Sequence, residues 1–116
     1  MTFKRRSKSS SLLLISMAAL VFALAPALAQ SSPTDGAALF KAKCAMCHGP
    51  DGAGKTPMGQ KLSVRDLRSA EVQKQPDADL MHVIGQGKAK MPAFGKSLNE
   101  DQIKLLVTYI RELGKK

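Results

Sequence analysis

Two cysteines and a histidine stand together in the middle of the chain. Cys44 and Cys47 are the only cysteines, two residues separate them, and His48 follows directly. Thiols and imidazoles bind metals, and thiols also act as nucleophiles and redox groups. This spacing therefore suits three kinds of site: a redox dithiol, one half of a zinc site, or a haem attached through two thioether bonds.

The rest of the sequence favours the haem site. A structural zinc site needs four ligands, usually as two pairs, and beyond this group the chain offers only His82. A redox C-x-x-C pair needs a βαβ context, and no strand pattern is visible. In the haem interpretation, both thiols add to the vinyl groups of one porphyrin, and His48 reaches its iron as the proximal ligand.

An electron-transfer haem needs a second axial ligand, and a methionine thioether in that position raises the reduction potential. Met46 lies inside the attachment turn and cannot reach the far side. Met81 falls on an expected helix, where core packing is the better interpretation. Met58 and Met91 both fall in expected loops. We expect Met91 to be the distal ligand, with Met58 next and His82 as a weaker alternative.

The first 29 residues have the features of a secretory signal peptide. Basic residues at positions 4–8 precede the apolar run "SLLLISMAALVFALA", and Ala27 and Ala29 form an A-x-A cleavage pattern. We expect cleavage after Ala29, which leaves one domain at 30–116 in the periplasm. The apolar run is short for a membrane-spanning helix.

Composition limits what this mature domain does. It has only three aromatic residues, Phe40, Phe94 and Tyr109, so its core needs another buried group. The leader removes four of the 18 basic residues and none of the 9 acidic ones, so the domain stays basic, at +5. An acidic protein partner or an anionic membrane surface fits this charge. Nucleic acid does not, because no binding motif is present.

Hydrophobic periodicity predicts an all-α domain. Thr34 or Asp35 should cap a helix that runs to the first cysteine, and residues 49–59 read as a loop. Short helical turns follow within 60–75, and a helix from position 76 should stop at Gly85 and Gly87. The last helix should begin after Asn99 with a capping box and end at Gly114.

Three separated segments, "GAALFKAKCAMCHGPDGAG", "KMPAFGKSLNEDQI" and "LLVTYIREL", resemble the mono-haem class I c-type cytochromes. The resemblance implies the class I cytochrome c fold, in which short helices surround one covalently attached haem c. The first and last helices should cross. The positions that match this crossing are Gly36, Phe40, Leu106, Tyr109 and Ile110.

The resemblance also extends to the groups around the haem. In the family a proline carbonyl accepts the N–H of the proximal imidazole, and Pro57 is the matching candidate. The tryptophan that contacts a haem propionate in some members is missing, which leaves Lys55, Arg65 or a backbone N–H for that role.

The expected function is a periplasmic one-electron carrier, monomeric and not an enzyme, that serves a respiratory or photosynthetic chain. Two alternatives remain: a subunit docked permanently in an oxidase or dehydrogenase, and a haem enzyme or gas-binding protein with a labile Met91. Lysines around the expected haem edge should form a docking face for an acidic redox partner. They are Lys41, Lys43, Lys55, Lys61, Lys88, Lys90 and Lys96.

Overall fold

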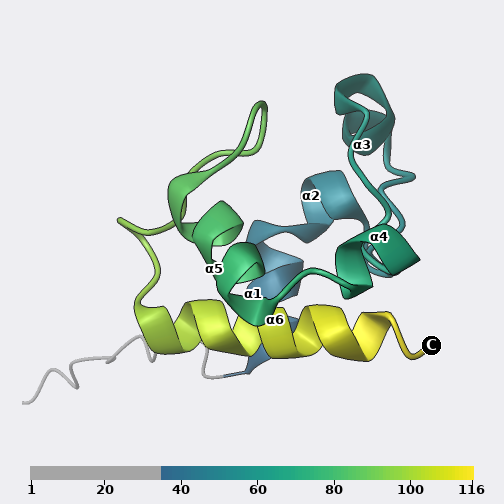
Figure 1. The fold of residues 1–116 in the computed structure, drawn as a ribbon. Helices are drawn as coiled ribbons and strands as arrows, with labels where there is room; N and C mark the ends of the chain where they lie inside the picture. Colours follow the sequence, from purple (N-terminus) through teal and green to yellow (C-terminus); the bar gives the residue numbers. More distant parts are fainter. Residues whose placement is uncertain (1–34) are drawn as a thin grey trace, which may run out of the picture. The chain divides into compact units, whose positions relative to one another are not determined.

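The computed structural model describes residues 35–116, so the predicted signal peptide, its cleavage site and Thr34 lie outside the described residues. The described domain is all-α, as expected, and contains one isolated β-bridge between Lys88 and Met91 but no strand (Figure 1). Its helices are α1 (Gly36–Lys43), α2 (Ala45–His48), α3 (Pro57–Leu62), α4 (Ala70–Gln73), α5 (Asp77–Gln86) and α6 (Glu100–Leu113).

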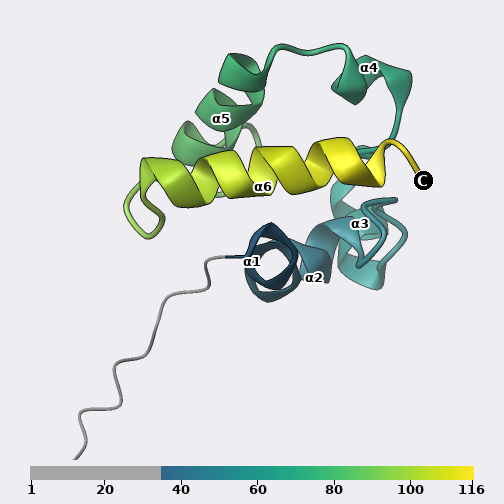
Figure 2. The ribbon, with the colours of Figure 1, turned by 90° about the horizontal axis from the view of Figure 1, so that it is seen from below.

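The first and last of these helices cross in direct contact. A Cβ atom on Gly36 would lie 2.4 Å from the carbonyl oxygen of Leu105, so only glycine allows this approach. One turn further along α1, the ring of Phe40 lies 5.2 Å from that of Tyr109, with a tilt of 52°. Figure 2 shows α1 nearly end-on beside the long α6. The predicted crossing is confirmed.

The core lies along α6. Its members are aliphatic except for Phe40: Leu39, Phe40, Val72, Leu80, Ile84, Leu98, Ile103, Leu106, Val107, Ile110 and Leu113. Five of them are the buried stripe of α6 itself. This packing holds α1, which precedes the attachment turn, and α5, which precedes the loop of Met91.

The ends of α6 follow the sequence closely. The Asn99 side chain accepts from the Gln102 N–H at 2.9 Å, and the Gln102 side chain accepts from the Asn99 N–H at 3.0 Å. This is the predicted capping box, and the C-cap is Gly114, also as predicted. At the start of the domain, Asp35 rather than Thr34 is the observed cap of α1.

Two predicted boundaries are wrong. The stretch 49–59 is not all loop, because α3 begins at Pro57 with Thr56 as its cap. Proline suits the first helical turn, where its missing N–H costs nothing, and the glycines nearby obscured that signal. Gly85 does not stop α5, which continues to Gln86 and is capped by Gly87. A single glycine inside a helix costs only about 1 kcal/mol, which packing offsets.

Side-chain hydrogen bonds of Gln73 and Arg111 connect α4 and the start of α5 to α6. Gln73 donates to the carbonyls of Leu67 and Ile110, at 2.7 and 3.1 Å. Arg111 donates to the carbonyl of Gln73 at 2.9 Å and to the carboxylate of Asp77 at 2.7 Å. Within residues 35–116, no helix has both the length and the apolar character needed to cross a membrane.

Candidate haem-attachment site

Both thiols and the imidazole lie on one helical turn. Cys44 joins α1 to α2, and its carbonyl accepts from the N–H groups of Cys47 at 3.2 Å and His48 at 2.9 Å. Both cysteines are free and half-buried. The turn therefore presents two unpaired thiols three residues apart with a histidine directly after them, as covalent haem attachment requires.

The surroundings of the turn set its protonation. Burial, followed by the neighbouring Cys47, raises the pKa of the Cys44 thiol to about 11. Burial lowers the pKa of His48, and the backbone carbonyl of Arg65 opposes that shift. The imidazole is therefore neutral at pH 7, which is the form that binds a metal.

One ring nitrogen of His48 lacks a hydrogen-bond partner within residues 35–116. Its Nδ1 atom is buried and has no hydrogen-bond partner among the described residues. The carbonyl of Arg65 faces the ring closely enough to affect its pKa, without forming a bond of normal geometry. Pro57 begins α3 and makes no hydrogen bond to His48 in this part of the chain. The role expected of Pro57 stays a prediction.

Met91 lies in a tight hairpin after α5. The backbones of Lys88 and Met91 exchange two hydrogen bonds, of 3.1 and 2.9 Å. Behind the hairpin, Phe94 and Gly95 donate to carbonyls in the last turn of α5 at 3.0 and 2.9 Å. A Cβ atom on Gly87 would lie 2.7 Å from the Met91 carbonyl oxygen. The loop is thus defined by its own backbone bonds and is attached to a core helix.

The other candidate ligands lie in helices. Met46 is in α2 and is 73% exposed, and Met58 is in α3 and is 40% exposed. Met81 packs against the core, as expected from its spacing. His82 is exposed on α5. Met91 is half-buried and is the one described methionine that lies outside a helix.

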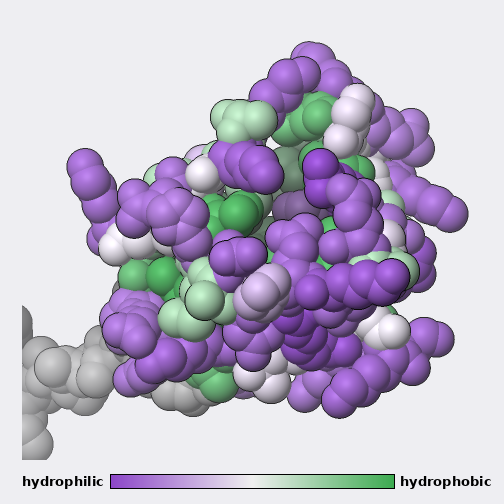
Figure 3. Space-filling view, in the orientation of Figure 1, coloured by the Kyte–Doolittle hydropathy of each residue, from purple (hydrophilic) through white to green (hydrophobic). Residues whose placement is uncertain are grey.

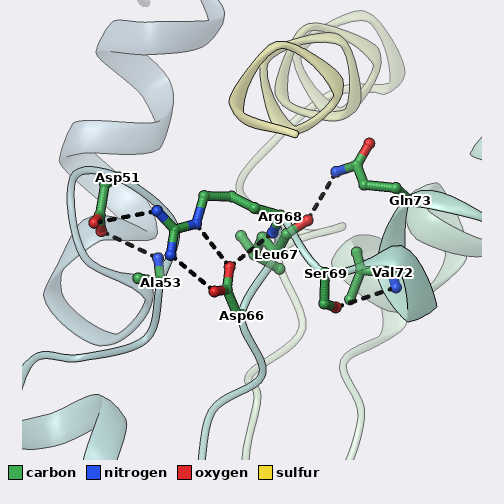
Figure 4. Close-up of polar contacts among 8 residues, drawn as sticks. All are labelled: Asp51, Ala53, Asp66, Leu67, Arg68, Ser69, Val72 and Gln73. Atoms are coloured by element: carbon green, nitrogen blue, oxygen red, sulfur yellow. Dashed lines mark hydrogen bonds and ion pairs between the residues drawn. The ribbon is translucent and has the colours of Figure 1, made fainter. Parts of the chain in front are cut away.

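A polar brace that the sequence did not predict supports the segment after the attachment turn (Figure 4). The Arg68 guanidinium forms two bonds to Asp66, at 2.9 and 2.8 Å, and approaches Asp51 at 3.7 Å. The backbone N–H of Leu67 donates to the carbonyl of Gly52 at 2.8 Å. No sequence motif marks this brace, because its partners come together only in the folded chain.

The groups proposed for the haem propionates differ in their surroundings. The Arg65 guanidinium pairs with Glu71 at 2.5 Å, whereas Lys55 is exposed and forms no ion pair within the described residues. That one of these groups contacts a propionate stays a prediction, with the alternatives still open.

The site fits a covalently attached haem. Two free thiols, a neutral imidazole with an unbonded nitrogen and a half-buried thioether are the donor set that the group requires. Figure 3 shows a hollow in one face of the domain, with hydrophobic residues inside it and both hydrophobic and hydrophilic residues around its edge. Cys44 and Cys47 would hold the porphyrin, and its iron would supply one-electron redox chemistry.

Comparison with known proteins agrees with this site. Residues 31–110 match the family described as cytochrome c oxidase, cbb3-type, subunit III. Cytochrome c6 of Nostoc sp. is 37% identical over 112 residues, which cover 93% of either chain. Cytochrome c6 of Synechococcus sp. is 35% identical over 82 residues, covering 71% of this chain and 70% of the relative. The chain belongs to the class I c-type cytochromes.

One solved structure and one longer protein are also similar to this domain. The structure titled KustC0563 c-type cytochrome is similar to this cytochrome with a TM-score of 0.64 and 33% identity, covering 68% of this chain and 96% of that one. The FixP subunit of a cbb3-type oxidase from Azorhizobium caulinodans is 35% identical over 80 residues. The match spans only 26% of FixP, so it corresponds to one part of a longer subunit. Family membership gives this cytochrome a covalent haem c and a place among electron-transfer proteins that work with redox partners.

Proposed function

We propose that this cytochrome is a periplasmic one-electron carrier whose haem iron is bound by His48 and Met91. The observation that supports it most is the position of Met91. This residue lies in a loop that is held by backbone hydrogen bonds, while the other three described methionines lie in helices. Met91 is also half-buried against the core, whereas Met46 and Met58 are exposed. With both axial positions filled, the site exchanges electrons and binds no substrate. Export would follow from the leader at 1–29.

The ligand assignment is tested by comparing two methionine variants of the holoprotein. Met91→Ala should open the distal position, lower the reduction potential and let cyanide bind readily, because the thioether that favours Fe(II) is gone. Met58→Ala is the matched control and should change none of these. Absorption spectra, potentiometry and cyanide titration measure the three effects. A low potential in Met58→Ala with an unchanged Met91→Ala would show that the assignment is wrong.

The charge pattern supports an acidic partner. The seven flanking lysines named above are exposed, and none forms an ion pair within the described residues. In contrast, Lys104 and all three arginines of the domain are paired with carboxylates. Uncompensated positive charge around the attachment turn and the Met91 hairpin would steer an acidic redox protein to this face.

Salt dependence tests that steering. The rate of electron transfer to the physiological partner should fall as salt rises, because the Debye length is about 10 Å at 0.1 M. Lys88→Glu or Lys90→Glu should lower the rate at low salt without moving the potential. Lys115→Glu, at the end of the chain, is the control and should have a smaller effect. Stopped-flow rates across a salt series measure this, and a flat or rising series would exclude a basic docking face.

A second function has one observation in its favour. The matched family is named for an oxidase subunit, and FixP carries a related segment. This cytochrome would then stay docked in a membrane complex. Fractionation separates the two functions: a carrier is released with the periplasmic contents, whereas a docked subunit stays with the membranes until detergent is added.

A further inference from the structure

The attachment turn ends with three carbonyls that its own helix leaves without partners. In α2, the carbonyls of Cys44 and Ala45 accept from N–H groups within the turn, up to that of Gly49. The next three, of Met46, Cys47 and His48, point beyond the end of the helix. Such terminal carbonyls need partners from elsewhere.

Residues 54–56 supply all of these partners. The N–H of Gly54 donates to the His48 carbonyl at 2.7 Å. The hydroxyl of Thr56 lies 2.9 Å from the Met46 carbonyl oxygen and 3.0 Å from that of Cys47, so one proton is shared between two acceptors. The same oxygen accepts from the Gly59 N–H at 2.9 Å as the cap of α3. One side chain thus ends α2 and begins α3.

The close packing of α3 on the turn leaves this arrangement little freedom. A Cβ atom on Gly59 would lie 2.3 Å from the Cys47 carbonyl oxygen, so the backbones of α2 and α3 are in contact. Figures 1 and 2 both show the two helices side by side. A displacement of Thr56 would therefore move the peptide units on either side of Cys47.

We propose that Thr56 is a positioning residue for the haem: its hydroxyl fixes the peptides that carry Cys47 and His48, and so orients the second thioether and the imidazole plane. The proposal rests on the covalent haem and, for the imidazole, on the proposed ligation by His48. It goes beyond the carrier function, because it assigns control of the ligand geometry to a residue outside the C-x-x-C-H motif.

The test compares variants of the holoprotein. Thr56→Val removes the hydroxyl at nearly constant volume, and Thr56→Ser keeps it. Thr108→Val is the matched control, since the Thr108 hydroxyl donates to the Lys104 carbonyl at 3.0 Å on an exposed part of α6. Asn99→Ala controls for lost stability, because it removes a helix cap far along the chain.

Two measurements report on the haem itself. Hyperfine-shifted proton resonances of the ferric haem methyls depend on the orientation of the imidazole plane, and the pyridine haemochrome spectrum reports any unreacted vinyl group. In Thr56→Val the methyl resonances should shift, and the share of haem with one thioether should rise several-fold. Thr56→Ser, Thr108→Val and Asn99→Ala should match the unsubstituted protein in both measurements.

Three results would overturn the proposal: unchanged spectra in Thr56→Val, equal changes in Thr56→Ser, or the same changes in Asn99→Ala. If Thr56→Val does not accumulate, hydrogen exchange in the unsubstituted protein decides. A protected Gly59 amide supports the bond to Thr56, and exchange at the rate of an exposed amide contradicts it. The two proposals can fail separately. If the methyl resonances shift in Thr56→Val but the unsubstituted protein fails to transfer electrons, the Thr56 proposal is supported and the carrier function is not.

Discussion

At the scale of single residues, burial prepares the two kinds of ligand in different ways. It keeps the His48 imidazole neutral by lowering its pKa, and it keeps the Cys44 thiol protonated by raising its pKa to about 11. A neutral imidazole binds iron without first losing a proton. A protonated thiol resists oxidation to a disulfide, since the thiolate is the reactive form. In the folded arrangement, both effects leave the ring and the thiol in their uncharged forms.

The sequence predicted Cys44, Cys47 and His48 because their chemistry depends on local spacing. It did not predict the role of Thr56, and it named Arg65 only as a candidate for a haem propionate, because the effect of both residues on the attachment turn depends on how α3 and the following loop fold back. The hydroxyl of Thr56 reaches carbonyls nine and ten residues earlier, a relation that no periodic pattern expresses.

The pair of Asp66 and Arg68 should make stability depend on pH in the acid range. Hydrogen bonds from Arg68 lower the pKa of Asp66 to about 2, below the value of about 3.9 in an unfolded chain. The stabilisation is therefore complete above pH 4 and is lost as pH falls towards 2. Because both side chains are more than a third exposed, its size should be below about 1 kcal/mol.

Asp66→Asn measures this contribution. The variant should be slightly less stable at pH 6 and should lose less stability than the unsubstituted protein between pH 4 and pH 2. Asp79→Asn, a residue without an ion pair in the described region, is the control. Chemical denaturation at a series of pH values gives the comparison. Parallel pH curves for Asp66→Asn and the unsubstituted protein would contradict the prediction.

At the scale of helices, the contact between α1 and α6 depends on one missing side chain. Gly36→Ala would place a Cβ atom 2.4 Å from the Leu105 carbonyl oxygen, so the helices must move apart. We expect a loss of about 2–3 kcal/mol, typical of overpacking. Gly85→Ala makes the same change inside α5, where the nearest atom would be 3.8 Å away. There the change should stabilise the protein by about 0.5–1 kcal/mol.

Thermal unfolding of the two holoproteins gives both values. The opposite signs separate the effect of helix contact from that of helix propensity, because both glycines are helical. A stabilised Gly36→Ala would mean that the crossing is looser than the structure indicates.

The sequence predicted α1 and α6 well because each carries its own capping residues and apolar stripe. It missed α3, whose start depends on Thr56 and Pro57 and whose six residues are too few to show a period. The same shortness left α4 as an indefinite helical turn. In this domain, the longer helices leave a clear pattern in the sequence, and the short helices do not.

At the scale of the whole molecule, the described core has few large side chains. Phe40 is its single buried aromatic residue, and the remaining members are aliphatic. A domain of this size rarely gains enough from such a core to fold alone. The haem would add the large apolar surface that is missing, so holoprotein formation and folding should be linked.

Replacing both cysteines with serine tests this linkage. The variant, which cannot attach haem, should show little helical circular dichroism and no cooperative unfolding transition. The holoprotein measured under the same conditions is the reference. A helical variant that unfolds cooperatively would show that residues 35–116 fold without haem.

The attachment of the Met91 hairpin has a consequence for motion. Between α5 and Leu98 the loop is held by backbone bonds to the last turn of α5 and by the partly buried side chains of Met91 and Phe94, which pack against the core without being fully buried in it. It can therefore detach as one cooperative unit while α1 and α6 stay packed. Under the proposed ligation by Met91, local opening of this kind would free that coordination position for short periods, so small anions could reach the iron at a rate set by the hairpin and not by global unfolding.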